Sequence, residues 1–84
     1  MQIDMTRMDP DCGMDRFYSV QLTRSIFGDS GVHRQWGRHG TWGRHRLDWF
    51  ETDGEAKCAL FELVKEKQAR GYLLKAPIPR RWAL

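Results

Sequence analysis

The segment RQWGRHGTWGRHR at residues 34–46 holds the side chains of this sequence that are best suited to contact an anion. It contains the tripeptide WGR twice and has no acidic residue. Guanidinium groups bind phosphate oxygens through paired hydrogen bonds, and indole rings stack on bases. The pattern therefore predicts a nucleic-acid-binding surface, whose candidate residues are Arg34, Trp36, Gly37, Arg38, Trp42, Arg44 and Arg46.

Within this segment, Trp36 has an arginine two positions away on either side. In an extended strand, Arg34, Trp36 and Arg38 share one face. Such a face is poor hydrophobic core, but it suits stacking on a base or sugar with phosphate contacts on both sides. The alternative is that an arginine stacks on Trp36 within the protein through a cation–π contact. For Trp49 we expect packing against the sheet, because Trp side chains are mostly buried.

Gly37 and Trp42 each leave two interpretations open. The missing side chain of Gly37 allows close approach by a backbone or a ligand, but it is equally typical of a β-bulge. Trp42 falls in the expected loop HGTWG. If Trp42 is exposed it is a second stacking group, and if it is buried it fixes the hairpin.

The three histidines, at positions 33, 39 and 45, do not complete the pattern of a structural zinc site. Such sites combine close ligand pairs such as C-x₂₋₄-C and H-x₃₋₅-H; successive histidines here are spaced H-x₅-H, but Cys12 and Cys58 are far apart and supply no cysteine pair. The sequence also shows no motif that joins a nucleophile, a base and an orienting group. We therefore predict no metal site, no cofactor and no enzymatic activity.

Composition limits the size and the environment of the protein. A chain of 84 residues allows one small domain, and its 14 Lys and Arg against 11 Asp and Glu agree with an anionic partner without requiring one. Two distant cysteines are too few for a disulfide framework, so we expect reduced thiols. The sequence shows no signal peptide and no membrane span, which indicates a cytoplasmic protein.

The elements that must position these residues form an α+β domain. Alternating residues in FYSVQL (17–22), a turn at 28–31 and glycines at 40 and 43 predict two hairpins, the second ending at Phe50. The segment 52–55 is a capping box for a helix that ends near Gly71. Its apolar face is formed by Ala56, Ala59, Leu60, Leu63 and Val64.

We therefore expect a small antiparallel β-sheet of three to four strands with one amphipathic helix packed on one face. The chain divides into an N-terminal segment, 1–15, that can add an edge strand, a core at 16–72, and a basic tail at 73–84 without regular structure. The other sheet face or the hairpin tips stay open to partners, and we expect Trp36, Trp42 and the arginines at those tips.

The segment RFYSVQL…FGDSGVHRQWGRHGTWG, followed by WF, a helix and KQARGY, resembles the WGR domain. The resemblance runs from Met8 to Tyr72. The signature tripeptide is Trp36-Gly37-Arg38, the opening aromatic strand carries Phe17 and Tyr18, and the companion glycines are Gly40 and Gly43. The closing Lys67 and Gly71-Tyr72 are similar to those of short bacterial WGR proteins.

The resemblance implies a small antiparallel sheet with one helix. In DNA-dependent poly(ADP-ribose) polymerases the WGR domain helps to hold a broken DNA end, its motif Trp stacks at the terminal nucleotide, and its motif Arg links DNA to neighbouring domains. These roles would fall on Trp36 and Arg38, with the second WGR at 42–44 outside the motif. This sequence shows no zinc finger and no catalytic domain, so we do not expect a polymerase.

Two functions remain open at this stage. The first is a DNA-binding module with a preference for ends or breaks. The second is a protein-interaction adaptor in which Trp36, Trp42 and Arg38 dock a partner protein.

Overall fold

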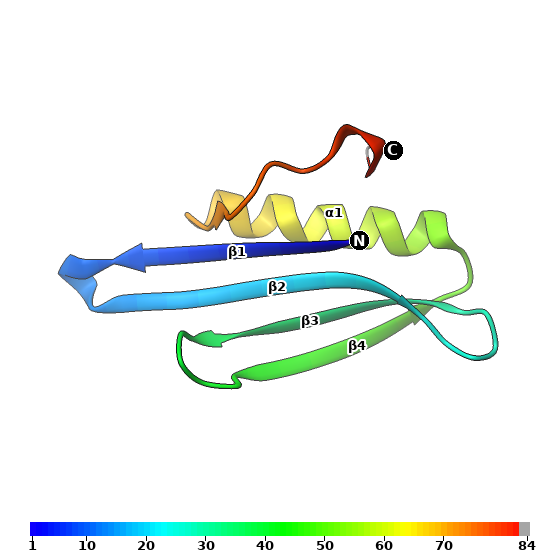
Figure 1. Cartoon of the computed structure of the whole chain (residues 1–84), viewed down its shortest axis with the longest axis horizontal. Helices are drawn as coiled ribbons and strands as arrows, with labels where there is room; N and C mark the ends of the chain where they lie inside the picture. The colour runs from blue at the N-terminus through cyan, green and yellow to red at the C-terminus, as the bar shows by residue number, and fades with distance from the viewer. Residues whose placement is uncertain (83–84) are drawn as a thin grey trace.

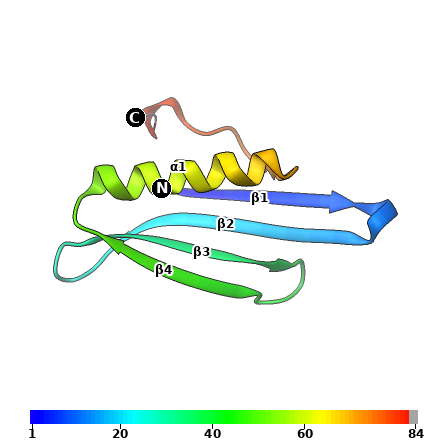
Figure 2. The same cartoon turned by 180° about the vertical axis from the view of Figure 1, so that it is seen from behind.

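The computed structural model describes residues 1–82, apart from the side chains of Cys12 and Trp82. It forms two layers, an antiparallel sheet and one helix that lies across one face (Figures 1 and 2). The strand order is β4-β3-β2-β1-β5. The elements are β1 (Gln2–Asp9), β2 (Met14–Arg24), β3 (Ser30–Arg38), β4 (Arg44–Phe50), α1 (Asp53–Ala69) and β5 (Leu73–Leu74), with 3₁₀ turns at Pro10–Cys12 and Arg80–Trp82.

The α+β class and the single helix are confirmed, but the sheet has five strands rather than three or four. The N-terminal strand β1 pairs with β2 along its whole length and also with β5, so it does not lie at the edge. The described part of the tail is not wholly irregular, because Leu73 and Leu74 pair with Thr6 and Met5. Its prolines come only after this short strand.

The core lies between the sheet and α1. Alternate residues of three strands and every third or fourth residue of the helix bury their side chains there, as the two periods require. The buried apolar residues are Ile3, Met5, Tyr18, Val20, Val32, Ala56, Leu60 and Val64. The predicted apolar face of the helix is thus confirmed, with Ala59 and Leu63 half-buried at its margin.

Both ends of α1 have the predicted caps. Thr52 accepts a hydrogen bond from the amide of Glu55 at 3.2 Å. At the other end Gly71 has a φ of +97°, and the amide of Tyr72 bonds to the carbonyl of Lys67 at 3.0 Å. These caps fix where the helix starts and stops above the sheet.

Asp53 ties the first turn of α1 to the β2–β3 end of the sheet. Its carboxylate accepts a hydrogen bond from the buried Ser30 hydroxyl and pairs with Arg24. The hydrogen bond from Ser30, followed by that from Arg24, holds the pKa of Asp53 below its usual value.

None of the helices within residues 1–82 combines the length and the apolar character that crossing a membrane would require.

We predict that Leu60→Ala lowers the free energy of unfolding by about 2–5 kcal/mol, because it leaves a cavity between the helix and the sheet. Leu73→Ala is the matched control: this leucine is 71% exposed, so its truncation should change stability by less than about 0.5 kcal/mol. Urea unfolding of both variants measures the difference. Equal losses would contradict the assignment of Leu60 to the core.

Candidate nucleic-acid interface

Strand register places Trp36 on the helix side of the sheet. Trp36 is paired with Tyr18 on β2 and with Arg44 on β4, and residues paired in this way share a face. Because Tyr18 is in the core, Trp36 faces the same side, where it is half-buried and packs against the core. Trp36 therefore lies beside the β3–β4 hairpin tip, since its partner Arg44 is the first residue of β4, but on the helix side of the sheet and not on the open face.

The indole of Trp36 is held by two neighbours. The Tyr18 ring lies 6.4 Å from it, tilted by 32°, and the guanidinium carbon of Arg34 lies 5.7 Å from its centroid. The cation–π alternative is thus confirmed for Arg34. Burial raises the pKa of the Tyr18 hydroxyl above its usual value, although the nearby Arg34 acts to lower it.

Arg34 and Arg46 share the carboxylate of Asp48. The distances are 4.0 Å from Arg34 Nη2 to Asp48 Oδ2 and 3.1 Å from Arg46 Nε to Asp48 Oδ1. Asp48 lies outside the carboxylate-free stretch of the sequence. It is two residues from Arg46 on β4, and strand pairing brings it close to Arg34 on β3. Two of the predicted phosphate ligands are therefore partly neutralised within the protein.

Four of the predicted residues, Trp36, Gly37, Arg38 and Arg44, line a recess of about 390 Å³ at the end of the β3–β4 hairpin. We call it the arginine recess. Its lining contains no carboxylate, and it consists of Arg16, Trp36, Gly37, Arg38, Thr41, Gly43 and Arg44.

The three arginines of this recess have no partner for their charge. Within residues 1–82, Arg16, Arg38 and Arg44 form no side-chain hydrogen bond and no ion pair, and all three are exposed. Arg16 and Arg38 lie directly opposite each other on β2 and β3, a like-charge pair that destabilises a sheet. An anion bound in the recess would relieve this repulsion.

Arg16 was missed by the sequence analysis because it lies far upstream of the WGR segment. The signal that could have found it is the hairpin register. Once Tyr18 is paired with Trp36, two further residues along the same ladder pair Arg16 with Arg38.

Gly37 and Gly43 close the loop that carries the recess. A Cβ on Gly37 would lie 2.8 Å from the Gly43 Cα, and a Cβ on Gly43 would lie 2.1 Å from the Trp36 carbonyl oxygen. Close backbone approach is thus the role that the structure gives to Gly37. The turn is also held by Thr41, whose hydroxyl and amide both donate to the Arg38 carbonyl, at 2.7 and 3.1 Å.

The histidines are spread over separate positions. The amide of His39 donates to the Asp15 carbonyl at 3.0 Å and its ring contacts the Asp15 carboxylate, so His39 joins the loop to the start of β2. His33 and His45 lie on the sheet face turned away from α1, with ring centroids 5.6 Å apart. The described residues contain no group of three side chains that could hold a metal ion.

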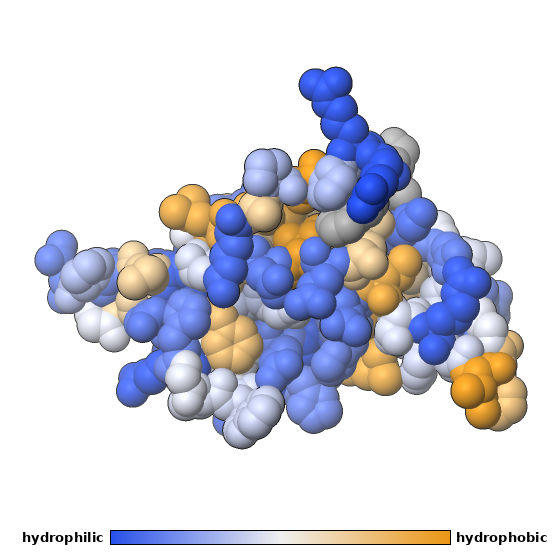
Figure 3. Space-filling view, in the orientation of Figure 1, coloured by the Kyte–Doolittle hydropathy of each residue, from blue (hydrophilic) through white to orange (hydrophobic). Residues whose placement is uncertain are grey.

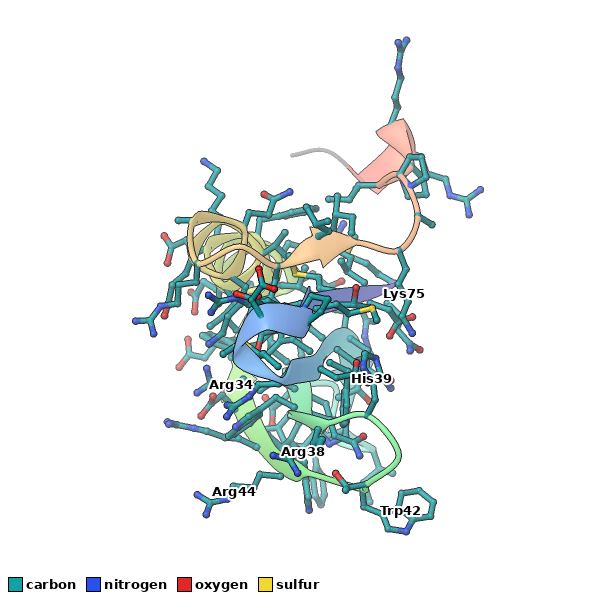
Figure 4. All side chains as sticks on the ribbon, turned by 90° about the vertical axis from the view of Figure 1, so that its left-hand side faces the viewer. Arg34, Arg38, His39, Trp42, Arg44 and Lys75 are labelled. Atoms are coloured by element: carbon teal, nitrogen blue, oxygen red, sulfur yellow. The ribbon has the colours of Figure 1, made fainter. Side chains whose placement is uncertain are left out.

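The second WGR tripeptide is divided between two surfaces. Its Gly43 and Arg44 belong to the arginine recess, whereas Trp42 is 89% exposed. Figure 4 shows Trp42 and Arg44 extending in opposite directions from the β3–β4 hairpin. Of the two interpretations of Trp42, the exposed one is confirmed.

Trp49 packs on the sheet, but on the face away from α1. Its ring lies over Gly31, where a Cβ would come within 2.8 Å of the indole. The side chain is 49% exposed and so does not belong to the core. Figure 3 shows a largely hydrophilic surface with an apolar tip at the β2–β3 loop, where Ile26 and Phe27 are exposed.

The sequence was also compared with models of known protein families. The family model of the WGR domain matches residues 1–78. This chain belongs to the WGR domain family.

This chain matches one part of each of two longer proteins. The uncharacterized protein y4dW of Sinorhizobium fredii is 32% identical over 77 residues, which are 90% of this chain and 38% of y4dW. A crystal structure of a Bacteroides fragilis protein superposes with a TM-score of 0.76 at 25% identity, over 90% of this chain and 20% of that one. The present chain therefore spans less than half of either relative.

We predict that Gly43→Ala lowers the free energy of unfolding by about 3 kcal/mol or more, because a Cβ would overlap the Trp36 carbonyl and φ is +67°. Gly40→Ala is the matched control: φ is +85° but a Cβ there meets nothing within 4 Å, so we expect about 1 kcal/mol. Denaturant unfolding distinguishes the two. Equal losses of stability would show that position 43 needs glycine only for its positive φ and not for the close approach to the Trp36 carbonyl.

Proposed function

We propose that this WGR domain binds nucleic acid, and DNA in particular, through the arginine recess. The observation that supports this most directly is that three arginines, Arg16, Arg38 and Arg44, line the recess together with Trp36. Within residues 1–82 these arginines form no ion pair, and no carboxylate is part of the recess lining. Exposed guanidinium groups that no protein acid neutralises are suited to phosphate oxygens. A DNA ligand also agrees with the cytoplasmic location that we propose.

The position of Trp36 favours a DNA end over the interior of a duplex. The indole is half-buried and is held by Tyr18 and Arg34, so it cannot extend outward to separate stacked base pairs. A terminal nucleotide has a free face that can enter the recess and meet the ring. Because the ring is already held in place, little side-chain freedom is lost on binding.

Arg34 and Arg46 have a different role in this proposal from the one expected. Asp48 already pairs with both, so we assign neither of them a phosphate contact, and Arg34 instead supports Trp36 through its cation–π contact. Direct phosphate contacts fall to Arg16, Arg38 and Arg44. The expected number of contacts is therefore three.

Three phosphate contacts give log K a slope of about −2.7 against log salt, so affinity should fall roughly 40-fold between about 50 and 200 mM salt. Arg44→Gln should make the slope less steep by about 0.9, because one contact is lost. Arg46→Gln, two residues along the same strand, is the control and should leave the slope nearly unchanged. Fluorescence anisotropy of a labelled duplex measures each slope. Equal changes in the two variants would contradict the assignment of contacts.

We also predict that a blunt, 5′-phosphorylated open duplex binds more tightly than the same duplex closed by loops at both ends. Trp36→Leu should remove this preference, since stacking contributes about 1–3 kcal/mol per base, while binding to the closed duplex changes little. Circular dichroism must show that the variant is folded. Absence of binding to both duplexes at low salt would overturn the proposed function.

A second candidate function is docking of a partner protein, which the exposure of Trp42 favours. Exposed tryptophans are common anchors of protein interfaces, and Trp42 projects away from Arg44. Such binding would depend little on salt, would survive DNA digestion and would be lost in Trp42→Ala. The same variant should leave the anisotropy response to DNA unchanged if only the recess binds DNA.

A further inference from the structure

Within residues 1–82, no strand pairs with the outer edge of β4. The strand forms one end of the sheet and is paired with β3 on its inner side, and its seven residues include neither proline nor glycine. Figures 1 and 2 show no other segment beside this edge. An uncovered edge of this kind offers its backbone groups to another strand. We propose that two copies of this chain join here, β4 against β4, into one ten-stranded antiparallel sheet.

Symmetry restricts the register of such a dimer. Antiparallel strands related by a twofold axis require the axis to stand perpendicular to the sheet, so one residue must lie opposite itself. If that residue is Leu47, the midpoint of Arg44–Phe50, all seven residues of both strands are paired. Arg46 then faces Asp48 of the second copy, and His45 faces Trp49 of the second copy.

Charge complementarity favours the same register. Arg46 and Asp48 are already bonded within one strand at 3.1 Å. Centred on Leu47, the two copies bring these four side chains into a square in which each charge has opposite charges along and across the strands. Moving the centre to Arg46 or to Asp48 would set that residue against its own copy, and like charges directly opposite each other destabilise a sheet.

Apolar contacts on the open face support the pairing. Leu47 and Trp49 are 42% and 49% exposed on the face turned away from α1. Leu47 would meet Leu47 of the second copy, and the Trp49 ring would meet His45 of the second copy. Cross-strand pairs of aromatic and aliphatic side chains are the units that stabilise a sheet.

The perpendicular twofold axis keeps both helices on one side of the joined sheet. Both arginine recesses would therefore open on that side, at opposite ends of the paired strands. Arg44 and its copy would be separated along the strand direction by six residue steps, or about 20 Å. The dimer itself rests on the edge and its register, and it does not depend on the proposed DNA function.

The test uses two opposite charges at one exposed position. Sedimentation velocity of the wild type without DNA, from about 10 µM to about 1 mM, should show the mass rise from the 9.9 kDa of one chain toward twice that value. Leu47→Lys and Leu47→Glu should each remain monomeric, because like charges would meet at the centre. An equimolar mixture of the two variants should recover the dimer, since opposite charges then meet there.

Ile26→Lys is the control for added charge, because Ile26 is 94% exposed in the β2–β3 loop, and this variant should dimerise like the wild type. Circular dichroism must show the same fold in every variant. A wild type that stays monomeric throughout the concentration range would overturn the proposal. So would a dimer that persists in both single variants, or a mixture that fails to associate.

Discussion

The contact between the backbones of Gly37 and Gly43 is the constraint on which the candidate site depends. It requires two glycines, since a Cβ at either position would lie 2.8 Å or less from the opposing backbone. Because the chain folds back this tightly, Arg38 and Arg44 both lie next to Trp36, one two residues further along β3 and the other opposite it on β4. Each of the two WGR tripeptides thus supplies one glycine of this backbone contact, although only the first tripeptide is the family motif.

The two ends of β3 differ in burial. At its start Ser30 and Val32 are buried, while at its end Arg38 is exposed. The repulsion between Arg16 and Arg38 therefore acts at the far end of the ladder, one step beyond Tyr18 and Trp36 on the same face. Both arginines are exposed, so their charges do not enter the core.

The sequence predicted the elements that local rules determine. The helix cap at Thr52, the terminal Gly71 and the alternation in 17–22 each depend on neighbours along the chain, and each agrees with the structure. The two-residue strand β5 could not be predicted in this way, because its strand partners, Met5 and Thr6, are distant in the sequence.

The candidate site was predicted in composition but not in geometry. Alternation showed that Arg34, Trp36 and Arg38 share a face, yet it could not say which face the helix covers. Val32 held that information, since it is the apolar residue of the same face and lies in the core. The approach of Asp48 to Arg34, and that of Arg16 to Arg38, require the strand register, which a single sequence does not give.

The arrangement of charge also separates the two candidate functions. A protein partner that covered the arginine recess would have to bring an acidic group to each of Arg16, Arg38 and Arg44, because a guanidinium buried without a partner carries a large desolvation cost. A nucleic-acid backbone supplies such groups at every nucleotide, and at a strand end it also supplies a base with a free face. Trp42 carries no such requirement, since it is a single exposed ring directed away from Arg44. These charge requirements favour the proposal that the recess binds DNA, and they leave Trp42 as the candidate anchor for a protein partner.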